Sequence, residues 1–264
     1  MSERVPAAGA DRITVLAQVD GSAAENRRCD RIVGARNPAI AATARVVARH
    51  YPDGLLIDIG TTTADVIPIA AGQVVAAGRT DPERLVLGEL IYTGALRTPA
   101  ESMGTQVPFG GAASRLSREA FALAGDVHVW RGDLEPSDYT VASPDGRPSS
   151  REFAGERLAR LVCADRDMVD EDEISAIADS LARSQVLEVA AGVGQVLAAN
   201  PTLRTAVVTG LGAFIAERAA REHGLDVVHL AARLGAAAAR CAPAAAVALL
   251  GEQFLSASGQ CPAD

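Results

Sequence analysis

The sequence contains no lysine, so all 25 of its strongly basic side chains are arginines. This absence excludes mechanisms in which a lysine acts as a catalytic group or grips a phosphate. Aromatic residues make up only 3% of the chain, whereas hydrophobic residues make up 48%. The core must therefore be built from alanine, valine, leucine and isoleucine. A length of 264 residues is enough for one large domain or two small ones.

The chain also lacks the positive charge that nucleic-acid binding requires. Its formal net charge is −8 and its isoelectric point is about 5.1. Nucleic-acid binding depends on clustered basic residues that neutralise phosphates, and the sequence has no arginine-rich arm and no interleaved aromatic residues. We therefore expect no nucleic-acid partner.

Cysteines are few and widely spaced, and long apolar runs are missing. The four cysteines, which fit no CxxC or Cys/His zinc spacing, are Cys29, Cys163, Cys241 and Cys261. The N-terminus shows no apolar segment of the signal-peptide type, and the alanine-rich run 236–250 is interrupted by Arg240 and Pro243. We expect a cytoplasmic protein with reduced thiols and no membrane contact.

What the chain does contain is an alternation of strand and helix patterns. The apolar runs that predict strands are 54–60, 205–210 and 225–230, and the first is continuous enough to be buried on both faces of a sheet. The segments that predict helices are 37–50, 150–163, 171–200, 212–224 and the two alanine-rich stretches after 229. This alternation predicts an α/β fold.

Further predictions concern the segments between these elements. Two short strand-like runs around 71–73 indicate a hairpin, and 13–19 forms one more strand-like run. A helix is expected from an N-cap at Asp81 to Gly94. The run 126–130, DVHVW, is expected to be a strand.

The strongest motif is the segment 58–65, DIGTTTAD, which follows a buried strand and precedes the hairpin. A glycine followed by small hydroxyl residues lets several backbone N–H groups converge on an anion. Asp58, at the carboxyl end of the strand, is where a Mg²⁺ contact to phosphates would lie, and Asp65 is close enough to orient a water or hold the turn. The same residues are also compatible with a tight β-turn whose threonines cap their own backbone.

A second motif, 207–213, VVTGLGA, forms a strand-to-helix turn with paired glycines. Such a turn can present a helix N-terminus to a nucleotide, or it can simply pack a helix onto a strand. The dinucleotide-binding fingerprint requires glycine or alanine where Ile215 stands, so NAD binding of the Rossmann type is not expected.

Weaker candidates accompany these two motifs. Arg79 lies between the hairpin and the next helix and is a candidate ligand of a phosphate or other anion, with a solvated loop that caps the helix as the equal alternative. Glu89 and Tyr92 are three residues apart, which would place them on one face of the predicted helix. Asp126 and His128 would share one side of the predicted strand, where a lone histidine is more often structural than catalytic.

Several segments occur in an order that resembles the hydantoinase/oxoprolinase family. The longest, LLIDIGTTTADVIPIAAGQVVAAGRTDPERLVLGELIYTGALRTP, is similar to the second phosphate-binding region of that family. The branch it resembles most is linked to tetrahydromethanopterin and methanofuran one-carbon metabolism. Further matches follow in EAFALAGDVHVW, the Asp145-Gly146-Arg147 segment, RLARLVCADRDM, VVTGLGAFIA and CAPAAAVALL. The resemblance covers about residues 35–252.

The resemblance implies a ribonuclease-H-like fold, as in actin, Hsp70 and sugar kinases, with a helical insertion. It implies Mg²⁺ at Asp58, and a bound ATP or diphosphate ligand. The residues to which it gives a phosphate-loop role are Asp58, Gly60, Thr61, Thr62, Thr63 and Asp65, with the two aspartates as catalytic candidates. The residues that it places at the nucleotide are Thr209, Gly210 and Gly212.

The same resemblance suggests a division of the chain. Its parts would be an N-terminal remnant and helix (1–50), a phosphate-loop part (51–100), a loop-rich and helical insertion (101–200) and a C-terminal part of the core (201–264). Relatives open with an Asp-x-Gly-Gly loop that is not found before Asp58. We therefore expect a truncated N-terminal half, with a homo-oligomer or partner chain covering the exposed edge.

The branch includes a methanofuran-biosynthesis synthase that joins an aminomethylfuran methyl diphosphate to γ-glutamyltyramine and releases diphosphate. The resemblance thus implies a transferase that acts on a phosphorylated small molecule and holds the leaving diphosphate in the threonine-rich loop. Two alternatives stay open. One is ATP-dependent hydrolysis of a cyclic amide, and the other is a non-catalytic protein that binds a ligand or partner.

Overall fold

The structure is a computed structural model that describes residues 38–258. Within this range one six-stranded sheet has the order β3-β2-β1-β7-β8, with β4 paired to β2. Its strands are β1 (Gly54–Ile59), β2 (Ala64–Ala70), β3 (Gln73–Val74), β4 (Leu90–Ile91), β7 (Thr205–Thr209) and β8 (Asp226–His229). β7 runs parallel to β1 and β8, whereas β2 runs antiparallel to β1, β3 and β4. The predicted α/β class is confirmed.

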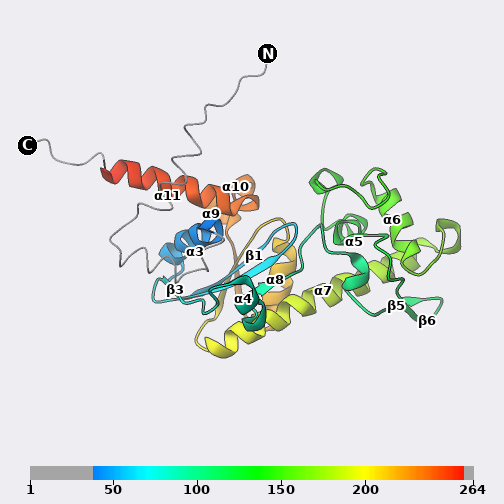
Figure 1. Ribbon diagram of the computed structural model, residues 1–264, viewed down its shortest axis with the longest axis horizontal. Helices are drawn as coiled ribbons and strands as arrows, with labels where there is room; N and C mark the ends of the chain where they lie inside the picture. Colours follow the sequence, from blue (N-terminus) through cyan, green and yellow to red (C-terminus); the bar gives the residue numbers. More distant parts are fainter. Residues whose placement is uncertain (1–37, 259–264) are drawn as a thin grey trace, which may run out of the picture.

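Helices cover both faces of this sheet (Figure 1). α3 (Pro38–His50) lies on one face, and α11 (Ala242–Ser258) packs against α3. α7 (Glu171–Ala199) and α8 (Ala213–Glu222) lie on the other face. Alternate residues of β1 point to the two faces, so Leu56 packs with the α3 core while Leu55 and Ile57 pack with the α7–α8 core. Burial on both faces explains the continuous apolar run of β1.

A second group of elements packs around the N-terminal half of α7, at the end of the molecule away from the sheet (Figure 1). Its elements are η1 (Ala100–Ser102), the β5–β6 hairpin (Gln106–Phe109 and Ala112–Arg115), α5 (Ala124–Arg131), η2 (Pro136–Asp138), α6 (Arg151–Arg160) and η3 (Arg166–Met168). The other helices are α4 (Asp81–Leu87), α9 (Ala231–Leu234) and α10 (Ala236–Arg240). Among residues 38–258, no helix combines the length and the apolar character that a membrane span requires.

Several local predictions are confirmed. The hairpin turn lies at Ala71 and Gly72, both with positive φ. Asp170 caps α7 and forms the expected capping box with Glu173. The predicted N-cap Asn37 and the strand-like run 13–19 lie outside the described residues.

Two element predictions are wrong. The run 126–130 belongs to helix α5, whose residues from Ala124 to Trp130 are all buried. The β-branched valines of this run suggested a strand, but here they serve to fill the core and do not mark an alternating strand pattern. The helix expected from 81 to 94 ends instead at Gly88, which has the left-handed conformation of a C-cap. Its N-cap is Thr80, and the following residues form β4 against β2.

Candidate functional site

The threonine-rich loop is the turn that joins β1 to β2. The amide of Gly60 donates to the carbonyl of Thr63 at 3.0 Å, which closes the turn, and the hydroxyls of Thr61 and Thr62 lie 3.3 Å apart. Among the described residues, the backbone N–H groups of Thr61, Thr62 and Thr63 have no hydrogen-bond acceptor. All three threonines are half-buried, so the loop that carries these unpaired donors is partly exposed.

A segment from outside the loop holds its carbonyl groups. The amide of Ala95 donates to the Gly60 oxygen at 2.9 Å, and the amides of Leu96 and Arg97 donate to the Thr61 oxygen at 3.2 and 2.8 Å. A β-carbon at Gly94 would lie 2.5 Å from the Thr62 nitrogen, so only glycine permits this close contact. We call residues 94–97 the loop clamp. It fixes the carbonyl side of the turn and leaves the amides unpaired.

Asp58 is a buried carboxylate beside this loop. It is 5% exposed, and no hydrogen-bond donor of the described chain reaches its side chain. Burial, and then the charge of Asp65 directly opposite on β2, raise the pKa of Asp58 to about 7. A buried charged group without a partner is costly, so this carboxylate is suited to an external cation or proton.

Asp65 has a different environment because it faces Arg84 of α4. The Arg84 Nη2 donates to Asp65 at 2.6 Å and to the carbonyl of Glu89 at 3.1 Å, and both side chains of the ion pair are buried. Burial raises the pKa of Asp65, and the guanidinium of Arg84 opposes that rise. Sequence patterns gave no indication of Arg84, which is a charged residue on the buried side of a seven-residue helix.

The second glycine motif lies beside the first. Thr209 of β7 pairs with Asp58 in the parallel register, and its hydroxyl donates to the carbonyl of Ala239 at 2.9 Å. The amide of Gly212 donates to the Ile59 carbonyl at 2.8 Å. Gly210 has φ +86°, and a β-carbon there would lie 2.5 Å from the Asp58 carboxylate. The two motifs therefore meet at one edge of the sheet.

The weaker candidates have other surroundings. Arg79 is exposed, its amide donates to Glu83 at 2.7 Å, and none of its described contacts is to the loop. Glu89 accepts from the amides of Ala77 and Gly78, so it orders the chain before α4. Tyr92 is 70% exposed and does not share a helix face with Glu89.

The residues of this site would fit a Mg²⁺ ion that is bound jointly by the protein and by a phosphate. Within the described residues, no three or more His, Cys, Asp or Glu side chains are grouped so as to hold a metal alone. Mg²⁺ is commonly bound by one or two carboxylates together with phosphate oxygens and waters. Asp58 could supply one such carboxylate, with the hydroxyls of the loop next to it.

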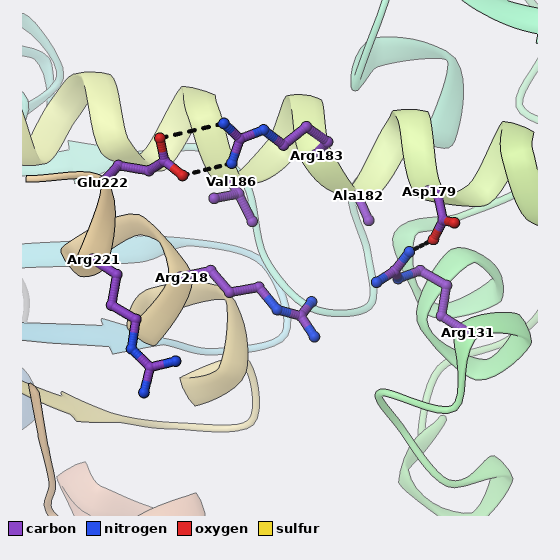
Figure 2. A pocket seen from close by; sticks show the side chains of 8 residues that line it. All are labelled: Arg131, Asp179, Ala182, Arg183, Val186, Arg218, Arg221 and Glu222. Atoms are coloured by element: carbon purple, nitrogen blue, oxygen red, sulfur yellow. Dashed lines mark hydrogen bonds and ion pairs between the residues drawn. The ribbon is translucent and has the colours of Figure 1, made fainter.

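A separate pocket lies between α5, α7 and α8 (Figure 2). Arg131, Asp179, Arg218 and Val186 are among the residues that line it, and none of the site residues predicted from sequence does. The pocket and the loop are therefore different surfaces of the protein.

Comparison with known proteins gives the family. A model of the hydantoinase/oxoprolinase family matches residues 4–253. Two curated relatives carry the name (4-{4-[2-(gamma-L-glutamylamino)ethyl]phenoxymethyl}furan-2-yl)methanamine synthase. The one from Methanocaldococcus jannaschii is 35% identical over 210 residues, which are 79% of this chain and 62% of that protein. The one from Methanococcus vannielii is 30% identical over 207 residues, which are 77% of this chain and 92% of that protein.

Among solved structures, the nucleotide-free structure of acetone carboxylase, from work on ATP-dependent acetone carboxylation, is similar with a TM-score of 0.41 and 14% identity. The match covers 81% of this chain and 31% of that chain. The family match spans nearly the whole sequence, and the two synthases align over more than three quarters of it. The chain belongs to the hydantoinase/oxoprolinase family, in the branch of these two synthases.

Proposed function

We propose that this chain binds the diphosphate group of a small-molecule substrate at the Thr61–Thr63 loop, with Mg²⁺ held at Asp58. The observation that carries the proposal is the Asp58 carboxylate, which is buried without a donor at the end of the strand that leads into a loop with three unpaired backbone N–H groups. Backbone donors and a metal-binding carboxylate are the two features that recur where proteins hold diphosphates.

The relatives suggest the reaction. Their name describes a product in which a phenol oxygen is joined to a methylene group on a furan that carries methanamine. We infer the corresponding transfer in methanofuran-type cofactor metabolism. The bond between the furfuryl carbon and the diphosphate oxygen breaks, the phenol oxygen bonds to that carbon, and the phenol proton is released. The loop amides orient the leaving diphosphate, and Mg²⁺, when bound, neutralises its charge.

Other residues have supporting roles in this proposal. Asp65 is engaged by Arg84, so we assign it the role of positioning the loop strand rather than direct contact with the substrate. Thr209, Gly210 and Gly212 form the neighbouring wall of the site, which in an ATP-using relative would lie toward the nucleotide. As part of the same proposal, the α/β core is of the ribonuclease-H-like type.

Calorimetric titration tests the binding step. Diphosphate, ATP and ADP are titrated with and without Mg²⁺ into the wild type, Gly60→Ala and the control Gly104→Ala. At both glycines a β-carbon meets only ordinary contacts, the nearest at 3.9 Å for Gly60 and 3.5 Å for Gly104, so both variants should fold. We expect Mg²⁺-dependent diphosphate binding that is weakened at least about tenfold in Gly60→Ala alone. Equal binding by both variants would place the site elsewhere.

An activity measurement tests the chemistry. The furfuryl diphosphate and the phenol are incubated with the protein and Mg²⁺, and the ether and released diphosphate are quantified. Equimolar formation of both products is expected, with loss of both in Asp58→Asn. Binding of ATP with hydrolysis, and no ether, would instead favour the ATP-dependent cyclic-amide hydrolase.

A further inference from the structure

The pocket in Figure 2 is small and combines apolar and charged side chains in its lining. Its volume is about 270 Å³, close to the lower end of the range of about 300–1,000 Å³ for ligand pockets. It therefore suits a molecule of amino-acid size better than a nucleotide. Ala182 and Val186 of α7 provide an apolar wall, and arginines from α5 and α8 face it.

The carboxylate of Asp133 holds two of these arginines in place. Arg131 Nε lies 2.7 Å from Asp133 Oδ2, and Arg218 Nη2 lies 2.7 Å from Asp133 Oδ1. Figure 2 shows the two guanidinium groups pointing toward one another across the pocket. Although burial acts to raise it, hydrogen bonds from His128, Arg218 and Arg131 hold the pKa of Asp133 well below its usual range. Asp133 thus remains ionised and fixes both cations.

The arginines keep capacity for another anion. Arg131 also contacts the carboxylate of Asp179, whose side chain is 67% exposed. Because Asp179 is exposed to solvent, its pairing with Arg131 contributes little stability, so a ligand carboxylate can replace it at low cost. Within the described chain, Arg218 Nε and Arg131 Nη2 have no acceptor. Asp179 marks one position of a carboxylate against Arg131, and Arg218, which also lines the pocket, keeps an unused N–H donor.

We propose that this pocket binds a small carboxylate with a short apolar body, and that binding is transmitted to the loop clamp. The carboxylate would bridge Arg131 and Arg218, and the apolar part would lie on Ala182 and Val186. The binding step does not depend on the diphosphate chemistry. The functional meaning of the coupling rests on the function proposed above.

A chain of buried and partly buried polar contacts connects the two surfaces. Asp133 contacts His128 Nδ1 at 3.3 Å, and His128 Nε2 lies 2.9 Å from Gln185 Oε1. Gln185 Nε2 donates to the Thr93 hydroxyl and to the Gly94 carbonyl, each at 2.9 Å. Gln185 is 0% exposed, so water does not compete for these bonds. A shift of Asp133 with its arginines is therefore felt at Gly94, the first residue of the loop clamp.

Calorimetry tests the binding step with L-glutamate, glutarate and benzoate as probes. Arg218→Met removes the guanidinium but keeps an apolar stem, and Arg115→Met, an exposed arginine on β6, is the control with the same change of charge. We expect at least one probe to bind with a Kd of about 1 mM or tighter, and Arg218→Met to weaken it at least about tenfold. Failure of all three probes at about 10 mM, or equal weakening in Arg115→Met, would overturn the proposal.

Hydrogen exchange tests the coupling without any diphosphate. The bound probe is expected to slow exchange of the amides of Ala95, Leu96 and Arg97 at least about threefold in the wild type. In Gln185→Met this protection should vanish while the probe still binds, which also shows that the variant is folded. Unchanged exchange in the wild type would refute the coupling. A protein that binds the carboxylate but no diphosphate would refute the proposed function and leave this site standing.

Discussion

At Asp58 the proposed role in binding Mg²⁺ and the stability of the folded chain favour opposite environments. Its pKa rises from 3.8 in the unfolded chain to about 7 in the folded one, so the folded state holds its proton more tightly. The stability that this group contributes is full below pH 3.8 and is lost as the pH rises through 7. At about 1.4 kcal/mol for each pKa unit, the loss reaches up to about 4 kcal/mol.

We therefore predict that Asp58→Asn stabilises the protein at alkaline pH. The difference in unfolding free energy between variant and wild type should grow by about 2–3 kcal/mol from pH 5 to pH 8, as measured by urea titration at both values. Added Mg²⁺ should stabilise the wild type and leave the variant unchanged at pH 8. A difference that does not depend on pH would show that the fold does not raise the pKa of Asp58.

Arg84, the ion-pair partner of Asp65, gives a second prediction, in which the substitution destabilises the protein. Arg84→Met keeps most of the side-chain volume but leaves Asp65 charged and buried, so we expect a loss of about 3–5 kcal/mol. The double variant with Asp65→Asn should recover part of that loss, because no unpaired charge then remains. Urea unfolding at pH 7 measures the free energy of unfolding of Arg84→Met, Asp65→Asn and the double variant. A loss below about 1 kcal/mol for Arg84→Met would mean that water solvates the Asp65 carboxylate in place of the guanidinium.

At the residue scale the sequence predicted the loop and both aspartates, but neither Arg84, which pairs with Asp65, nor Gln185, which contacts Thr93 and Gly94. Asp58 and Asp65 follow from the strand–loop–strand pattern, which is local. Arg84 and Gln185 reach the site from distant parts of the chain, and nothing in their own neighbourhoods distinguishes them from surface residues. Contacts over such separations depend on tertiary packing, and a single sequence does not contain them.

At the scale of the element, the same distinction explains which predictions failed. β1, α7 and α8 carry strong periodicity or caps and are where we expected them. The short segments were misassigned, because α5 is buried on every side and β4 exists only through its pairing with β2. Burial on all sides removes the period that separates helix from strand.

The turn between β7 and α8 yields a prediction about an element boundary. Gly210→Ala forces a left-handed alanine and places its β-carbon 2.3 Å from the Ile59 carbonyl. Gly224, at the end of α8, also has positive φ but has nothing within 4 Å, so Gly224→Ala isolates the backbone cost of about 1–2 kcal/mol. We expect Gly210→Ala to cost at least about 1 kcal/mol more than this control in thermal unfolding. Equal costs would mean that β1 and the turn can move apart.

At the scale of the whole molecule, α7 joins two hydrophobic cores. Its first half, which includes Ile174, Ile177 and Leu181, packs with the α5–α6 group, and its second half, which includes Val189 and Val193, packs with the sheet. A helix of 29 residues that contributes to both cores makes each depend on the other. The sequence predicted the helix and its cap, but not that it is shared.

We therefore predict that the described part of the chain unfolds as one cooperative unit. Trp130 is the single tryptophan, lies in the α5–α6 core and donates to Ser175 of α7 at 3.1 Å, so its fluorescence reports on that core. Asp170→Ala removes the N-cap of α7 at a cost of about 1 kcal/mol. Fluorescence and far-ultraviolet circular dichroism should show the same midpoint, lowered by about 2–4 °C in the variant. The exposed Asp226→Ala should leave both unchanged, and two separate transitions would show that the cores unfold independently.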